Sequence, residues 1–96
     1  MAELRVYNNT FNEFKGQTPD EVIQAVYRES QAHTGASYAE WWSYQQDIWR
    51  RSYNAKIPDM QEDGACDALL KVLLDVGALE EGPKPAAKTP TQLTPG

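Results

Sequence analysis

One aromatic stretch, residues 37–54 (SYAEWWSYQQDIWRRSYN), constrains the fold of this chain more than any other feature. It contains all three tryptophans and three of the five tyrosines of the 96-residue sequence. Its first residue, Ser37, is followed three positions later by Glu40, which is the spacing of a capping box. In that motif the serine side chain accepts from an amide of the first helical turn, and the glutamate accepts from the serine N–H. The stretch is therefore predicted to be one helix.

Large apolar side chains occupy one side of this predicted helix when its residues are projected at ~100° each. The members of this sector are Tyr38, Trp41, Trp42, Tyr44, Ile48, Trp49 and Tyr53. The sector spans roughly 180°, which exceeds the ~100° stripe that buries one helix face. Gln45 points into the same sector, where an indole N–H or a tyrosine O–H would have to bond its amide. Either the domain covers this helix on two sides, or part of the aromatic surface is left for a partner.

Two interpretations of this surface stay open. In the first, the stretch is a core helix with a small polar cluster. In the second, Trp41, Tyr44 and Arg51 form a contact edge, because Trp, Tyr and Arg dominate interface hot spots. Arg50 and Arg51, with Tyr53 nearby, likewise form either a solvated pair near a helix C-terminus, where cations are stabilised, or an anchor for an acidic partner.

Two further helices are expected on either side of the aromatic stretch. Thr18 followed by Pro19 and, three residues after the threonine, by an acidic residue predicts a helix over residues 19–34. Asp59 with Glu62 repeats the capping pattern and predicts a third helix over residues 60–77. The apolar face of this third helix is aliphatic and is expected to pack against the tryptophans.

The N-terminal residues 4–15 favour a short β-hairpin that turns at Asn8-Asn9, because asparagine tolerates positive φ and its neighbours suit strands. The alternative is an irregular arm that carries Phe11 and Phe14 into the core. Four of the six prolines fall in residues 82–96, a composition that predicts a disordered tail. The expected fold is thus α+β and mostly helical: one domain over residues 1–81, with the hairpin packed on a three-helix bundle.

Charge and composition narrow the classes of function. Residues 1–81 carry seven Lys and Arg against fourteen Asp and Glu. An acidic domain does not attract phosphate backbones or anionic membrane surfaces, so nucleic acid and membrane are disfavoured as partners. The sequence has no apolar run long enough for a signal peptide or a membrane span, and only one cysteine. These features predict a cytoplasmic protein whose partner is another protein.

No motif predicts catalysis, a metal site or a cofactor. His33 and Cys66 are the only histidine and cysteine, and a Cys–His dyad is formally possible. The acidic residues around Cys66 oppose thiolate formation, however. Residues 59–70 resemble a calcium-binding EF-hand loop at some positions, but Leu70 stands where that loop needs a bidentate glutamate. The sequence therefore predicts that the protein is not an enzyme and holds no cofactor.

The leading hypothesis is a non-catalytic protein-binding module: a small adaptor, regulator or inhibitor of a larger protein, of the size and composition typical of phage and mobile-element inhibitors. The alternative is a structural or self-assembling subunit, including a homodimer, that uses the aromatic helix as its interface. A DNA-binding helix-turn-helix regulator is disfavoured, because the third helix has only Lys71 as a cation. The candidate partner-binding residues are Trp41, Tyr44, Arg50, Arg51, Tyr53 and the acidic residues Asp59, Glu62, Asp63 and Asp67.

Overall fold

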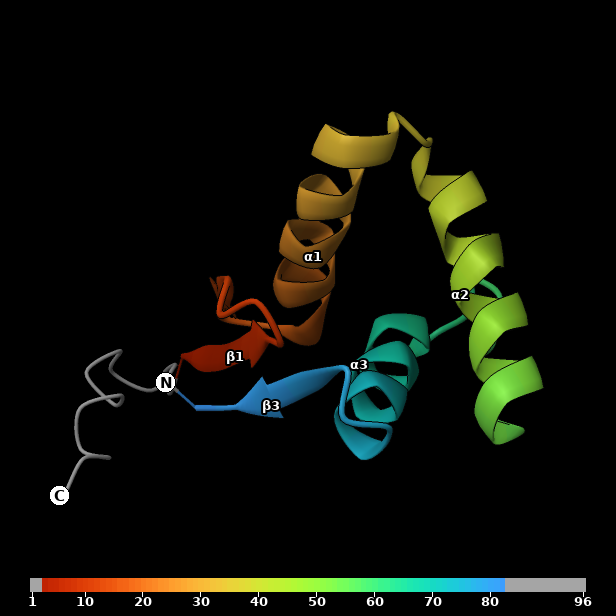
Figure 1. Cartoon of the computed structure of the whole chain (residues 1–96). Helices are drawn as coiled ribbons and strands as arrows, with labels where there is room; N and C mark the ends of the chain where they lie inside the picture. The colour runs from red at the N-terminus through yellow and green to blue at the C-terminus, as the bar shows by residue number, and fades with distance from the viewer. Residues whose placement is uncertain (1–2, 83–96) are drawn as a thin grey trace, which may run out of the picture.

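The computed structural model describes residues 3–82, which form three helices and a small antiparallel sheet (Figure 1). The sheet has three strands in the order β2-β1-β3. The α+β class predicted from the sequence is confirmed. In chain order the elements are β1 (Leu4–Asn8), β2 (Glu13–Gly16), α1 (Pro19–Thr34), α2 (Tyr38–Tyr53), α3 (Ala65–Asp75) and β3 (Leu79–Glu81).

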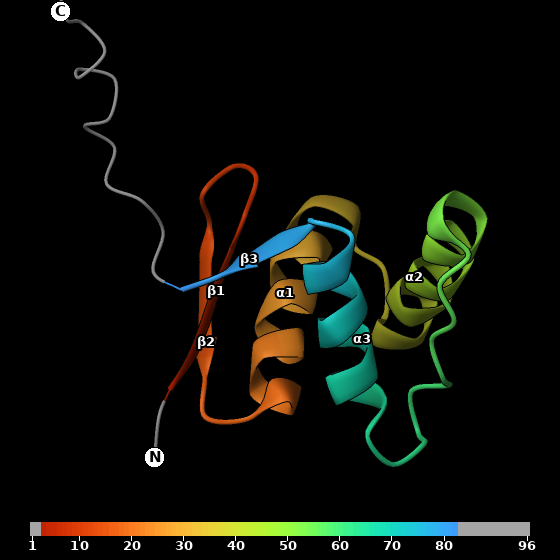
Figure 2. The same ribbon diagram turned by 90° about the horizontal axis from the view of Figure 1, so that it is seen from below.

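The elements are arranged in layers rather than as a closed bundle. Helices α1 and α3 pack side by side against the sheet, and α2 lies beyond them on the side away from the sheet (Figure 2). Figure 1 shows α1 and α2 diverging from the turn that joins them. The predicted three-helix bundle is not confirmed. Helix α2 joins the core through large side chains, since Trp41 and Trp42 belong to the buried cluster shared with α1 and α3, and the distance between packed helices depends on the size of the side chains at the contact.

The N-terminal hairpin forms as predicted, but with a longer loop. Strand β1 ends at Asn8 and β2 begins at Glu13, so the connection comprises the four residues 9–12 rather than a tight turn at Asn8-Asn9. The Oδ1 atom of Asn8 accepts hydrogen bonds from the backbone N–H groups of Thr10 (3.0 Å) and Asn12 (2.9 Å). This side chain closes the loop in place of a two-residue turn.

Helices α1 and α2 begin and end where the sequence predicts. The Thr18 hydroxyl accepts from the Glu21 N–H at the start of α1. Gly35, in the left-handed region at φ 72°, ends that helix. Both bonds of the predicted capping box between Ser37 and Glu40 are present at the start of α2. The two helices are therefore set by local sequence signals.

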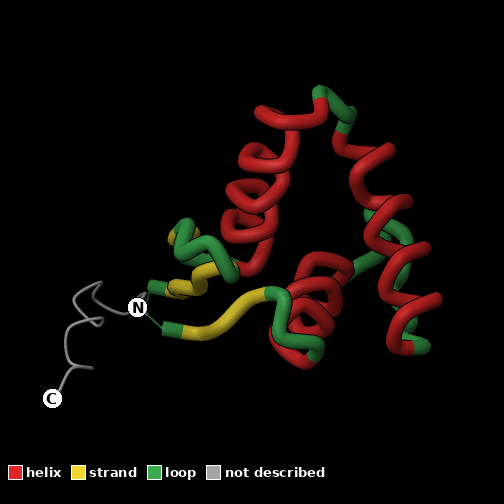
Figure 3. The backbone as a smooth tube through the Cα atoms, viewed as in Figure 1, coloured by secondary structure: helices red, strands yellow, loops and turns green. Residues whose placement is uncertain are grey.

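Helix α3 is shorter than predicted, because it begins at Ala65 and not near residue 60. Gly64 adopts φ 76° immediately before it and provides no side-chain cap. The Glu62 N–H bonds the Asp59 carbonyl in a separate turn, so these two residues do not cap the helix. They lie in the long α2–α3 loop, which runs back alongside α2 (Figure 3).

Strand β3 was not predicted. The structure places Leu79 opposite Asn8 at the end of β1. Three residues with no alternation of apolar and polar side chains carry too weak a signal for a strand. The predicted tail, residues 82–96, lies outside the described residues except for Gly82.

The core joins the sheet, α1, α3 and the inner face of α2. Its aliphatic residues come mainly from α1 and α3, and its largest side chains come from α2, so the tryptophans and the leucines belong to one cluster as predicted. The buried apolar residues are Val6, Phe14, Val22, Ile23, Tyr27, Trp41, Trp42, Ile57, Ala65, Leu69, Leu70, Leu73 and Leu79.

Gly16 joins β2 to α1 at a point where no side chain fits. A Cβ atom there would lie 2.6 Å from the Cβ of Glu21 and 3.1 Å from the backbone nitrogen of Val22. We expect Gly16→Ala to lower the free energy of unfolding by about 1–3 kcal/mol, the usual cost of overpacking. Urea denaturation would measure the loss of stability, with Lys15→Ala as the control because Lys15 is an exposed neighbour of Gly16. Equal stability of the two variants would contradict the close approach of β2 and α1.

Candidate functional site

A cleft between α1 and α2 is the candidate binding site, and we call it the α1–α2 cleft. It consists of two adjoining hollows, of about 220 and about 350 Å³, which share Ser30, Trp41 and Gln45. The first hollow reaches toward the sheet and α3 and is also lined by Asn8, Phe14, Val26, Glu29, Trp49, Leu73, Ala78 and Leu79. The second lies near the α1–α2 turn and is also lined by Thr34, Ala36, Glu40 and Tyr44.

Aromatic packing sets the angle between the two helices at the closed end of the cleft. The Tyr38 ring lies edge-on to Tyr27, with 5.1 Å between centroids, and stacks on Trp41 at 5.8 Å. The Tyr27 hydroxyl donates to the carbonyl of Ala36, within the turn, at 2.7 Å. Such aromatic pairs are rigid and favourable beyond their buried area. The cleft is therefore held open by the fold itself.

The opposite side of α2 is fastened to the α2–α3 loop. The indole Nε1 of Trp42 donates to the Pro58 carbonyl at 2.8 Å. The side-chain amide of Gln46 donates to the carbonyls of Ile57 and Pro58 and to Oδ1 of Asp59, at 3.0–3.2 Å. These bonds hold that side of α2 against the loop. The side of α2 that carries Trp41 and Gln45 faces the cleft.

Two hydrogen-bond donors on the wall of the cleft have no acceptor within residues 3–82. The Oε1 atom of Gln45 accepts from the Trp49 indole at 2.8 Å, which leaves the Gln45 Nε2 unused. The Trp41 indole N–H likewise has no partner among the described residues. No enclosed side-chain nitrogen in this part of the chain lacks a partner, so both donors keep a small exposed area, and both side chains line the cleft. The wall of the cleft therefore offers N–H groups to an acceptor.

The charged side chains that line the cleft are acidic. Glu29 borders the first hollow and Glu40 the second, and neither hollow is lined by Lys, Arg or His among the described residues. Glu29 is 3.2 Å from the Nε2 atom of His33 and accepts from Asn12. Glu40 accepts from the Ser37 N–H. A ligand that enters the cleft meets an apolar floor and a negative rim.

The structure separates the predicted aromatic and basic site residues. Trp41 and Tyr44 line the cleft. Tyr53 does not, and its ring packs on Trp49 at a centroid distance of 5.8 Å. Arg50 and Arg51 are exposed, and both pair with the carboxylate of Asp47, at 3.1 and 2.8 Å. The single negative charge of Asp47 therefore offsets one of the two positive charges of Arg50 and Arg51.

The four predicted acidic site residues form no single site. Asp59, Glu62 and Asp63 lie in the α2–α3 loop, Asp67 lies in the first turn of α3, and all four are exposed. None of them lines the cleft. Within residues 3–82 no three His, Cys, Asp or Glu side chains come together in an arrangement that could hold a metal ion. These four acidic residues belong to a solvated surface of the α2–α3 loop and the start of α3, outside the cleft.

Several cleft residues were missed from sequence. Gln45 was placed in the aromatic sector, and its indole partner matches the expectation, yet it was not chosen as a site residue. Ser30, Trp49 and Leu73 were not chosen either. Ser30 and Leu73 come from helices that meet α2 only in the folded state, so no local pattern marks them. The one available signal was a polar residue inside an aromatic sector.

Cys66 and His33 do not form a dyad. The Sγ atom of Cys66 lies 3.7 Å from the hydroxyl of Tyr38. Besides burial, the negative charge of Asp20, in the first turn of α1, helps to raise the pKa of both groups. His33 is in the last turn of α1, ~20 Å along the helix from Asp20 at 1.5 Å per residue. Burial, with the Asp20 charge as a smaller cause, raises the pKa of the Cys66 thiol. Burial and the contact with Cys66 raise the pKa of Tyr38 as well.

These two raised pKa values predict a loss of stability at alkaline pH. The folded chain keeps protons on Tyr38 and Cys66 in a range where the unfolded chain, with pKa values of about 10 and about 8.5, releases them. Stability is therefore complete below about pH 8.5 and falls as the pH rises further. Urea denaturation between neutral and alkaline pH would measure this decline. The double variant Tyr38→Phe/Cys66→Ala should show a shallower decline, and an unchanged one would refute the assignment.

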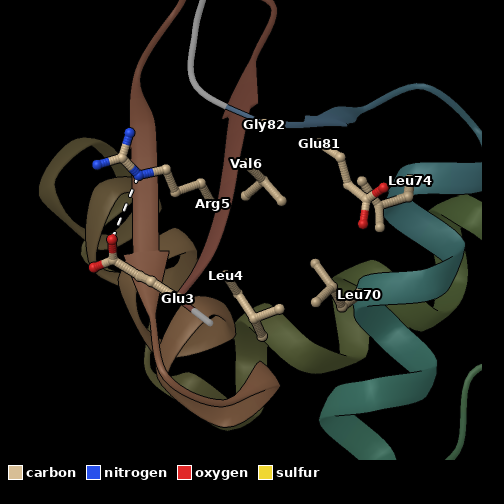
Figure 4. A pocket seen from close by; sticks show the side chains of 8 residues that line it. All are labelled: Glu3, Leu4, Arg5, Val6, Leu70, Leu74, Glu81 and Gly82. Atoms are coloured by element: carbon tan, nitrogen blue, oxygen red, sulfur yellow. Dashed lines mark hydrogen bonds and ion pairs between the residues drawn. The ribbon is translucent and has the colours of Figure 1, made fainter. Parts of the chain in front are cut away.

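A second groove lies between β1 and α3 (Figure 4). Its volume is about 400 Å³. The side chains of Leu4 and Leu70 point toward one another across it, and Arg5 and Glu3 form an ion pair at its rim (Figure 4). It ends at Gly82 and contains none of the predicted site residues. It lacks the unpaired donors of the α1–α2 cleft.

Comparison of the chain with protein-family models, with curated proteins and with solved structures gave no match. Among residues 3–82, no helix combines the length and the apolar character that crossing a bilayer requires. The case for function therefore rests on the geometry of the cleft.

Proposed function

We propose that this protein is a non-catalytic binding module that docks on a larger protein and takes a segment of it into the α1–α2 cleft. The observation that carries the proposal is the cleft itself, an apolar hollow held open between two helices with unpaired donors on its wall. Clefts of a few hundred Å³ with an apolar lining and a few placed polar groups are typical binding sites. In this role the protein is an adaptor, a regulator or an inhibitor that acts in the cytoplasm.

The residues that line the cleft are those that dominate binding energies. Tyr44 is 57% exposed at its edge, and Trp41 is only 5% exposed in its wall. Tyrosine and tryptophan are enriched among hot spots, especially beside pockets from which water is excluded. A wall fixed by aromatic packing also loses little conformational entropy when a ligand binds. The cleft is therefore suited to binding without rearrangement.

Self-assembly is the second candidate function. Tyr44 and Tyr53 are both 57% exposed on the same helix, and this surface suits a symmetric contact between two copies. Sedimentation over a wide range of concentrations separates the two candidates. A binding module is expected to stay monomeric, whereas a self-assembling subunit is expected to dimerise.

Site-specific photo-crosslinking tests the proposed function. A benzophenone side chain would replace Tyr44, and in a control chain it would replace Tyr53, which has the same exposure on the same helix but lies outside the cleft. Both chains would be irradiated in a lysate of the producing cell. We expect one protein to be captured through position 44 and not through position 53. Equal capture by both positions, or none by position 44, would refute the cleft as the docking site.

A further inference from the structure

We propose that the α1–α2 cleft binds an extended, cationic segment of the partner, with two large apolar side chains in the two hollows and two backbone carbonyls bonded to Trp41 and Gln45. This inference rests on the proposed function and specifies the chemistry of the ligand. It starts from the two unpaired donors, which are not accounted for by the fold.

The first step is the burial of these donors. Trp41 is 5% exposed and Gln45 8% exposed, so each is more than nine-tenths buried. Within residues 3–82 the Trp41 indole N–H and the Gln45 Nε2 have no acceptor, and both side chains line both hollows. The bond from Trp49 to the Gln45 Oε1 fixes which end of the amide carries the free N–H. Both donor atoms keep a small exposed area, so an occupant that covers them is favoured only if it brings acceptors, because a donor that is buried without a partner is costly.

The second step is the spacing of the donors. Trp41 and Gln45 are four residues apart, on the same face of α2, with a rise of about 6 Å between them. Alternate residues of an extended chain are about 6.6–6.8 Å apart, and their carbonyls point to the same edge. One turn of α2 therefore matches two residues of an extended segment. The carbonyls of a helix interior are already used by their own helix, so a helical ligand would leave both donors unpaired.

The third step is the chemistry of the hollows. Side chains of an extended segment stand across the line of its carbonyls, so flanking residues can enter the hollows on either side of Gln45. Leu73 and Trp49 line the first hollow, and Trp41 and Tyr44 line the second, which favours large apolar side chains in both. Glu29 and Glu40 are the charged residues that line the hollows. Their charge favours Lys or Arg in the segment and disfavours Asp and Glu.

A random peptide library displayed on phage tests this inference without knowledge of the natural partner. The full-length chain would be the bait, and selected peptides would be synthesised and their Kd values measured by calorimetry. We expect enrichment of peptides with two large apolar residues and at least one Lys or Arg. Isotope-edited NMR of a bound peptide is expected to show extended backbone and no helix.

Two variants probe the donors directly. Gln45→Glu keeps the oxygen that accepts from Trp49 but replaces the N–H donor by a second oxygen, and Gln31→Glu makes the same charge change at an exposed site on α1. We expect Gln45→Glu to weaken peptide binding about tenfold or more and Gln31→Glu by less than about twofold. Replacement of Trp41 by benzothienylalanine, which has the shape of the indole but no N–H, is expected to weaken binding several-fold. Far-UV circular dichroism would confirm that each chain folds.

The results distinguish this inference from the proposed function. Equal peptide affinity of Gln45→Glu and Gln31→Glu, a helical bound peptide, or enrichment of acidic peptides would overturn the inference and leave a cleft that docks by other contacts. If no peptide is selected but a protein is captured through position 44, the inference is overturned and the proposed function stands. Dimerisation abolished by Gln45→Glu would identify a second copy of the chain as the occupant and overturn both.

Discussion

Replacement of Trp42 by alanine is expected to lower the free energy of unfolding by about 3–5 kcal/mol, the usual cost of truncating a buried aromatic residue to alanine. Trp42 is 2% exposed. It is one of the two buried tryptophans through which α2 joins the core, and its indole donates to the Pro58 carbonyl. The substitution thus removes the largest buried volume and the shorter of two hydrogen bonds to the Pro58 carbonyl, which keeps only the bond from Gln46. Because small domains have only about 5–15 kcal/mol of stability in total, the loss is a large fraction of it.

Urea denaturation followed by far-UV circular dichroism would measure this effect, since the signal does not depend on tryptophan. Tyr53→Ala is the matched control, because Tyr53 is an aromatic residue of the same helix with 57% exposure, and we expect a loss below about 1 kcal/mol. Trp42→Phe separates the ring volume from the hydrogen bond and should fall between the two. Equal stability of Trp42→Ala and Tyr53→Ala would show that α2 does not pack on the core as described.

Replacement of Tyr44 by alanine is expected to weaken binding of a cleft-bound peptide about 30-fold, with the stability of the fold unchanged. Tyr44 is exposed at the edge of the cleft, so its truncation leaves no cavity in the core. A hot-spot residue contributes about 2 kcal/mol or more, and about 1.4 kcal/mol corresponds to a tenfold change in Kd. Calorimetry with a selected peptide would measure the change in affinity.

Tyr53→Ala serves again as the control for this prediction. Tyr53 has the same exposed fraction as Tyr44 and lies on the same helix, but outside the cleft. We therefore expect Tyr53→Ala to change the Kd of the peptide less than about twofold, since truncations away from the hot spot have small effects. Similar losses in the two variants would mean that the whole outer surface of α2 makes the contact. That result would favour the broad aromatic interface of a self-assembling subunit over a cleft.

The charges of the molecule bear on how a partner approaches. The acidic residues of the α2–α3 loop and the pair Glu29 and Glu40 lie on different sides of α2, and both surfaces favour a basic partner. Arg50 and Arg51 share the carboxylate of Asp47 and provide little net charge for an acidic one. Electrostatic attraction of this kind mainly raises the association rate and weakens with salt. The acidic loop would therefore assist the approach of the segment that the cleft retains.

The sequence alone determined the elements whose signals are local. Thr18 and Gly35 mark the ends of α1, and the bonds between Ser37 and Glu40 begin α2. The turn signal at Asn8-Asn9 and the strand-forming residues on either side of it indicated the hairpin. These signals suffice because caps and turns are satisfied by residues three or four positions away. The same local reasoning placed Gln45 among the tryptophans.

Only the tertiary structure decided how these elements meet. The positive φ of Gly64 delays α3, and β3 exists because Leu79 and its neighbours find β1 as a partner. The pairing of β3 depends on contacts between residues far apart in the chain, whereas the start of α3 follows a turn closed by bonds from the Glu62 N–H to Asp59 and from the Ala65 N–H to Glu62. The cleft is of the same kind as the pairing of β3, since its walls come from α1, α2 and α3. The sector of about 180° on one helix left open whether the domain covers this helix on two sides or leaves aromatic surface for a partner. The packing of α2 against α1 and α3 decided that Trp41 and Gln45 are buried and that they line a cleft.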